Sequence, residues 1–248
     1  MAGHSKWANI KHKKARMDAK RGKAWSKCSK AIMVAAKEGG GDPASNLRLR
    51  YAVEEAKAAN MPKDTIERAI KKGSGELGGA KFESVRYEGY GAAGVAVIVD
   101  TLTDNRNRTA PEMRDIFKKA GGNLGATGCV SYNFETKGII VIEEEHTSED
   151  QIMELAIEAG AEDVSLDGAW TVTTDPADFL TVKEAIDTAE IQTLSAEVTM
   201  IPNSMQEVTG EDVAKVIRLI DNLEDNDDVQ KVYSNLDASE EDIAAATD

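Results

Sequence analysis

Apolar residues in the first third of the chain recur at spacings of three and four, the period of one face of an α-helix. Trp25, Cys28, Ile32 and Ala35 follow this spacing, and Gly39-Gly40-Gly41 comes directly after them. We therefore predict a helix that ends at these glycines, with Trp25 on its buried face.

Two further helices are predicted before residue 73. The first begins at Asp42-Pro43, an N-cap residue followed by a proline suited to a first helical turn, and runs to about residue 59. The next begins near Pro62 and ends at Lys71-Lys72-Gly73, where cations and a glycine suit a helix C-terminus. Their predicted buried residues are Leu49, Val53, Ala56, Ile66, Ala69 and Ile70. This part of the chain is predicted to be a small helical domain.

From Val85 the period changes to that of strands. We predict strands at 85–90, 94–102 and 130–134, and a helix at 109–120. Thr109 and Glu112 have the spacing of a capping box at the start of that helix.

A regular alternation follows. Strands are predicted at 138–143, 163–167, 169–174 and 193–201, and helices at 149–159 and 176–189. This order, βαββαβ, is the ferredoxin-like split motif. A helix at 211–223 and a strand at 229–233 come after it, and they would supply the second helix and strand that the earlier ββαβ segment lacks.

The predicted fold class is therefore α+β. An N-terminal helical bundle is followed by two small α/β domains, the second a ferredoxin-like unit inserted in the other. The predicted boundaries are 1–78 for the basic helical domain, 79–134 plus 204–240 for the first α/β domain, and 135–203 for the insert. The glycine-rich stretch Gly73–Gly79 is predicted to be a flexible linker.

Charge is divided unevenly along the chain. Residues 1–30 carry ten Lys or Arg against one acid, Asp18, in a chain whose formal net charge is −14. Residues 1–72 carry +11 and residues 73–248 carry −25. Cations crowded together without acids repel one another, so this pattern predicts a head that binds a polyanion, joined to an acidic body.

Several classes of protein are not supported. The longest uninterrupted apolar run is Val95–Val99, far short of a membrane span, and no apolar segment follows the basic N-terminus as in a secretory signal. Cys28 and Cys129 suggest neither a disulfide framework nor paired metal ligands. We expect a cytoplasmic protein without a membrane partner.

Partial matches to motifs of catalysis and cofactor binding each lack a required element. The stretch from Gly89 to Gly94 matches G-x-G-x-x-G, but a predicted strand follows it rather than the helix that a dinucleotide site needs. His4, His12 and His146 have no metal-ligand spacing with the cysteines, and Asp225–Asp228 lacks the turn glycine of a calcium loop. We predict no enzyme activity, no cofactor and no metal.

The candidate nucleic-acid-binding residues fall into two groups. Those in the head are Lys6, Trp7, Lys11, His12, Lys13, Lys14, Arg16, Lys20, Arg21, Lys23 and Lys27, with Trp7 able to stack on a base or ribose. Those in the body are Asn105, Arg106, Asn107 and Arg108, between a strand and a helix N-terminus. For the second group, a phosphate or base-edge contact and a loop braced by internal hydrogen bonds and salt bridges both remain open.

The opening residues Met1–His12, with Asp18–Lys23, resemble the start of the YebC family, which includes mitochondrial translational activators of cytochrome oxidase. Further blocks similar to the family's are Tyr87–Gly91, Asp104–Thr109, Gly121–Gly128 and Asp228–Tyr233. The resemblance implies a helical first domain, two α/β domains and no known catalytic activity. Because the motif begins at Met1, it also leaves no room for an organelle presequence.

Most members of the family are labelled probable transcriptional regulators that bind DNA, and others are assigned to translation at the ribosome. We therefore expect a nucleic-acid-binding transcriptional regulator, with a ribosome- or RNA-associated translation factor as the alternative. A protein-interaction scaffold is a third possibility, in which the inserted domain would bind the partner. A monomer is assumed, because the sequence does not indicate an oligomeric state.

Overall fold

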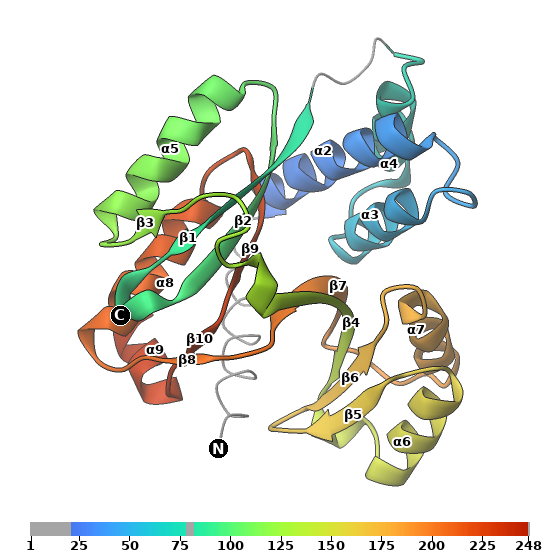
Figure 1. Cartoon of the computed structure of the whole chain (residues 1–248). Helices are drawn as coiled ribbons and strands as arrows, with labels where there is room; N and C mark the ends of the chain where they lie inside the picture. Colours follow the sequence, from blue (N-terminus) through green and yellow to red (C-terminus); the bar gives the residue numbers. More distant parts are fainter. Residues whose placement is uncertain (1–20, 78–81, 248) are drawn as a thin grey trace. The chain divides into compact units, whose positions relative to one another are not determined.

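The computed structural model describes residues 21–77 and 82–247 (Figure 1). Their backbone contacts form two compact units, one made of residues 133–205 and the other of residues up to 132 together with residues 206–247. None of the helices in these ranges combines the length and the apolar character needed to cross a bilayer.

Three helices open the larger unit: α2 (Arg21–Gly39), α3 (Leu47–Ala58) and α4 (Lys63–Gly73). Ile32, Leu49 and Ala56 are fully buried in their shared core. The predicted start of α3 at Asp42 is wrong, because the side chain of Asn46 caps the helix by accepting a hydrogen bond from the Leu49 N–H at 3.1 Å.

Two other predictions for this region are corrected. Trp25 is 37% exposed, and its ring N–H donates to the carbonyl of Ala59 at the end of α3, so the indole lies at the edge of the core. Gly73 is the last residue of α4 and is buried, so it does not begin a free linker. A β-carbon at Gly73 would lie 2.4 Å from the backbone oxygen of Met33, which explains why α4 needs glycine where it crosses α2.

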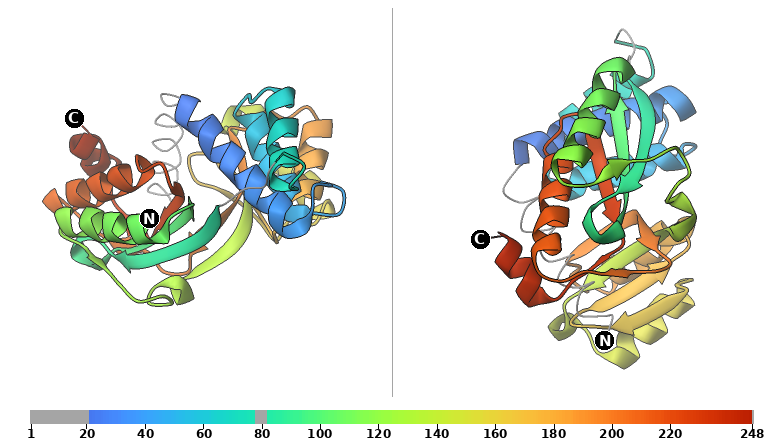
Figure 2. Two further views of the ribbon diagram at one scale, coloured as in Figure 1. Left: turned by 90° about the horizontal axis from the view of Figure 1, so that it is seen from above. Right: turned by 60° about the vertical axis from the view of Figure 1, so that its left-hand side comes forward.

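A four-stranded antiparallel sheet forms the rest of this unit. Its order is β3-β1-β2-β9, from β1 (Glu83–Tyr90), β2 (Ala96–Thr103), β3 (Asn123–Leu124) and β9 (Val229–Ser234). Helices α5 (Arg106–Lys119) and α8 (Glu211–Glu224) contact each other and lie side by side over the sheet (Figures 1 and 2). Since β9 pairs with β2, the C-terminal segment completes the sheet begun before residue 134, as the insertion prediction requires.

The loop between β1 and β2 contains the end of the Gly89–Gly94 motif and leads into a strand, as predicted, rather than into a helix. It contains the short 3₁₀ helix η1 (Ala92–Gly94), in which Ala93 and Gly94 have φ values of 53° and 77°. The parallel pair β8 (Gln206–Glu207) and β10 (Leu236–Asp237), on either side of α8 and β9 in the chain, and the C-terminal helix α9 (Glu240–Thr247) were not predicted.

The smaller unit has the predicted βαββαβ order. Its elements are β4 (Phe134–Ile142), α6 (Glu149–Glu158), β5 (Asp163–Leu166), β6 (Trp170–Thr174), α7 (Phe179–Thr188) and β7 (Ser195–Pro202). The sheet order is β5-β6-β4-β7, antiparallel throughout, which confirms the ferredoxin-like motif. Ile140, Ile152 and Val182 are fully buried between its sheet and helices.

The predicted strand at 130–134 is wrong. Residues 131–133 form the 3₁₀ helix η2 (Ser131–Asn133), and β4 starts only at Phe134. The backbone N–H groups of Val130 and Ser131 are bound by a side chain, that of Glu88, and so cannot take part in a strand ladder.

Candidate nucleic-acid interface

Most of the predicted head residues lie outside the described ranges. These are Lys6, Trp7, Lys11, His12, Lys13, Lys14, Arg16 and Lys20. Arg21 and Lys23 belong to the first turn of α2. The geometry of the candidate site therefore rests on Lys27 in the head and on residues 105–108 in the body.

Two lysines of α2 face the acidic body. The Lys27 ammonium donates to the carbonyl oxygen of Glu224 at 2.8 Å. The Lys30 ammonium donates to the carbonyl of Asp227 at 2.7 Å and lies 3.4 Å from a carboxylate oxygen of Asp228. These intramolecular acceptors stabilise both cations without a nucleic acid.

Arg108, another predicted site residue, is also bound within the protein. Its guanidinium lies 2.6 Å from Asp228 Oδ2 and 3.1 Å from Asp104 Oδ1. Asp228 is only 5% exposed whereas the Arg108 side chain is 46% exposed, so the arginine binds a buried carboxylate from the surface. Of the two alternatives, a nucleic-acid contact and a segment stabilised by internal salt bridges, the structure therefore favours the second for Arg108.

The carboxylate of Asp228 collects polar groups from three elements. The hydroxyls of Thr109 on α5 and Thr103 on β2 lie 2.9 and 3.2 Å from its Oδ2, in addition to Arg108 and Lys30. Burial by itself would raise the pKa of Asp228, but hydrogen bonds from Arg108 and Thr109 and the charge of Lys30 hold that pKa below its ordinary value. Asp228 therefore acts as a charged joint between α2, β2, α5 and β9.

Thr109 is part of this joint, so it does not cap α5 as predicted. The helix begins three residues earlier, and Asn105 is its cap, accepting a hydrogen bond from the Arg108 N–H at 3.2 Å. The capping-box prediction failed because Asn105 offers an equally good cap and the Thr109 hydroxyl is used by Asp228.

Arg106 and Asn107 are the first two residues of α5, and both are exposed. The Arg106 side chain is 61% exposed, and its nearest charged partner is Glu83 at 3.7 Å. An exposed cation and amide next to free helix N–H groups keep the phosphate-binding alternative open for these two positions.

Three further exposed cations lie near the end of α4: Arg68, Lys71 and Lys72. Within the described ranges these three side chains form no ion pair. The sequence does not mark Lys71 and Lys72 as a site, because cations in a last helical turn are explained by the helix dipole alone.

A second feature missed in the sequence is the buried carboxylate of Glu88, which is 3% exposed. It accepts backbone hydrogen bonds from Gly128 at 2.9 Å and from Val130 and Ser131 at 3.0 Å each. Burial would raise the pKa of Glu88, but these N–H groups hold it below its usual value. The neighbouring Tyr132 is 77% exposed, so a fixed loop carries an aromatic ring into solvent.

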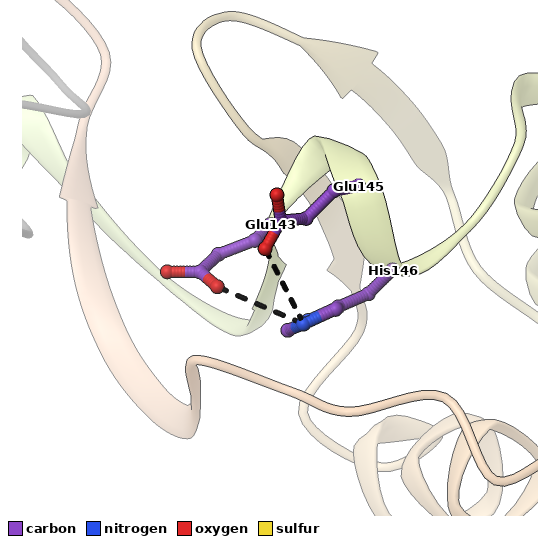
Figure 3. A group of neighbouring side chains, drawn as sticks. All are labelled: Glu143, Glu145 and His146. Atoms are coloured by element: carbon purple, nitrogen blue, oxygen red, sulfur yellow. Dashed lines mark ion pairs between the residues drawn. The ribbon is translucent and has the colours of Figure 1, made fainter.

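Glu143, Glu145 and His146 bring metal-ligand atoms together in the smaller unit, around the 3₁₀ helix η3 (Glu144–His146; Figure 3). His146 Nε2 lies 3.8 Å from Glu143 Oε2 and 4.0 Å from Glu145 Oε1. A histidine that ligates a metal normally donates its other ring N–H to a partner. The Nδ1 atom of His146 is buried and has no hydrogen-bond partner among the described residues, so this cluster lacks the support that a metal-bound histidine normally has.

Two family descriptions together match nearly the whole chain. Residues 5–76 match the TACO1/YebC protein N-terminal domain, and residues 82–236 match the TACO1/YebC second and third domain.

Individual proteins match over the same length. A "Probable transcriptional regulatory protein" of Natranaerobius thermophilus is 56% identical over 241 residues, 96% of each chain. One with the same description from Treponema denticola is 56% identical over 97% of this chain and 98% of its own. The crystal structure of a conserved hypothetical protein, Aq1575, from Aquifex aeolicus has a TM-score of 0.79 at 49% identity, covering 90% of this chain and 93% of that one.

Proposed function

The chain belongs to the TACO1/YebC family, and from this premise we propose that it is a regulatory factor that binds nucleic acid and performs no catalysis. The names of its relatives support a regulatory role in transcription. We further propose the nucleic-acid target and the residues that contact it, which those names do not give.

One observation carries the proposal: the segregation of charge. Ten cations against a single acid occupy residues 1–30 of a chain with a net charge of −14. Binding of phosphates is the most general way to stabilise such a segment. The phosphates neutralise the cations, which removes the repulsion between them, and binding releases counterions. The exposed Arg68, Lys71 and Lys72 on α4 extend the cationic character beyond the N-terminal residues.

DNA is the leading target, in agreement with the names of the relatives. A ribosomal or RNA target is the second candidate, and one observation favours it. The acidic body, with −25 over residues 73–248, would be repelled by a long duplex, whereas a ribosome presents basic protein as well as RNA. The protein would dock through its head in either case.

Affinity for a promoter duplex and for ribosomes, measured over a salt series, tests the proposal and separates the two targets. Replacing Lys11, Lys13 and Lys14 by Gln should lower affinity and reduce the slope of log K against log salt by about 2 to 3. A matched control replaces three cations of α5, Arg114, Lys118 and Lys119, and should leave the slope nearly unchanged.

Each result has a defined meaning. Equal losses in the two triple variants would contradict a binding head. Tight promoter binding without ribosome co-sedimentation would exclude the translation alternative, and the reverse result would exclude the transcriptional one.

A further inference from the structure

The helical segment and the acidic body of the larger unit meet through charged and polar contacts. On α2, the ammonium groups of Lys27 and Lys30 donate to the carbonyl oxygens of Glu224, the last residue of α8, and of Asp227, between α8 and β9. Lys30 also lies 3.4 Å from the Asp228 carboxylate and 5.2 Å from the centre of the Phe82 ring. Its side chain is only 15% exposed.

A second ion pair joins the same two parts. Lys231 on β9 lies 3.0 Å from the carboxylate of Glu55 on α3. Burial and the charge of Glu55 together raise the pKa of the Cys28 thiol on α2 to about 11, and the charge of Lys231 opposes the rise, so both residues act on this thiol. The thiol of Cys28 is therefore a native reporter of this contact.

The apolar core of the helical segment is nearly complete without the body. Its buried members come from α2, α3, α4 and the α3–α4 connection, between residues 32 and 69, and Phe82 is the member contributed from beyond α4. Since the helical segment has most of its own core, its contact with the body can open locally while that core remains folded. The Lys231–Glu55 pair is partly exposed, so it adds little to the contact and is weakened further by salt.

We propose that this contact is an autoinhibitory latch, in which the body's 224–231 segment holds cations of the nucleic-acid-binding helix until phosphates replace it. The inference rests on the proposed function. Lys27 and Lys30 follow Arg21 and Lys23 on α2, so they continue the cationic run of the head. A phosphate is a stronger acceptor for an ammonium group than a carbonyl oxygen is, and binding therefore favours the released form.

The Glu55–Lys231 pair allows a test in which the latch and simple electrostatics predict opposite results. Lys231→Glu places two carboxylates against each other and should open the latch, so affinity for a duplex or for ribosomal RNA rises about fivefold. Without a latch, the same change adds negative charge to the body and lowers affinity. Glu55→Lys should also raise affinity, and the double variant Glu55→Lys/Lys231→Glu should return to the wild-type value.

Lys215→Glu is the matched control, because it makes the same charge change at an exposed position on α8. A loss of affinity in Lys231→Glu equal to that in Lys215→Glu would overturn the latch and leave the proposed function intact. Absence of nucleic-acid binding by all variants and by the wild type would overturn the proposed function, and the latch with it.

Alkylation of Cys28, followed site by site by mass spectrometry without nucleic acid, gives a structural readout. Lys231→Glu should accelerate alkylation of Cys28 and leave Cys129 unchanged if the latch opens. The new charge alone would raise the thiol pKa and slow the reaction. Slower alkylation in this variant would therefore overturn the latch, whatever the affinity measurements show.

Discussion

The guanidinium of Arg108 lies 2.6 Å from the carboxylate of Asp228, although the two residues are 120 positions apart in the chain. Asp228 is buried and Arg108 is not, so this pair connects the surface at the start of α5 to the junction of α2, β2 and β9. A residue expected to bind phosphate therefore already has a carboxylate partner, and that partner also binds a lysine of the head.

Asp228→Asn should lower the stability of the larger unit by about 2 to 3 kcal/mol, because it leaves Arg108 and Lys30 without their shared buried anion. Urea unfolding followed by circular dichroism measures the change. Asp104→Asn is the matched control, since it removes an exposed carboxylate from the same arginine, and it should cost less than about 1 kcal/mol. Equal effects would show that Asp228 is not the joint described above.

Acid should weaken this unit. The folded-state pKa values of Asp228 and Glu88 are lowered, so both carboxylates contribute stability above the unfolded-state pKa of about 4, and that stability is lost as the pH falls through the lowered values. Unfolding free energies measured between pH 7 and pH 3 should therefore decline less steeply in Asp228→Asn and in Glu88→Gln than in the wild type. Parallel curves would contradict the assignment.

Glu88→Gln should loosen the loop that ends at Tyr132, because an amide cannot accept the three backbone hydrogen bonds as well as a carboxylate does. Hydrogen exchange at the amides of Gly128, Val130 and Ser131 should become faster, with little change in α2. Glu83→Gln, an exposed change on the same strand, is the control and should not alter these amides.

Gly73→Ala should destabilise the packing of α4 on α2 by about 1 to 3 kcal/mol, because the added methyl group would lie 2.4 Å from the Met33 carbonyl oxygen. Gly41→Ala is a milder control, since its nearest contact is a side-chain atom of Ser74 at 3.2 Å. Thermal unfolding compares them. A Gly73→Ala variant as stable as the wild type would mean that the helices shift apart without cost.

Arg106→Gln should weaken nucleic-acid binding about threefold to tenfold and reduce the salt slope by about 1, with almost no effect on stability. Arg114→Gln removes the same charge from an exposed position two turns further along α5 and should change binding less. If the two variants bind equally well, the exposed first turn of α5 at residues 106–107 does not contact phosphate.

Much of the fold followed from local patterns. The helices around Leu49, Ile66 and Met113 and the βαββαβ order of residues 134–202 were predicted because burial on one face leaves a period in the sequence. Boundaries were predicted less well where several caps were available, as at Asn46 and Asn105. The strand expected at Val130 failed because Glu88, 42 positions earlier, binds its N–H group.

The sequence by itself determined the order of the elements and the separation of a cationic head from an acidic body, since period and charge are properties of neighbouring residues. Only the tertiary structure decided which cations are already bound, because Lys27, Lys30 and Arg108 meet acceptors that lie between 120 and 198 positions away. A side chain binds groups that are close to it in space, and the local sequence pattern does not specify which groups these are. For this reason the sequence does not distinguish Asp228 from the other acidic residues, and only the folded structure identifies its partners.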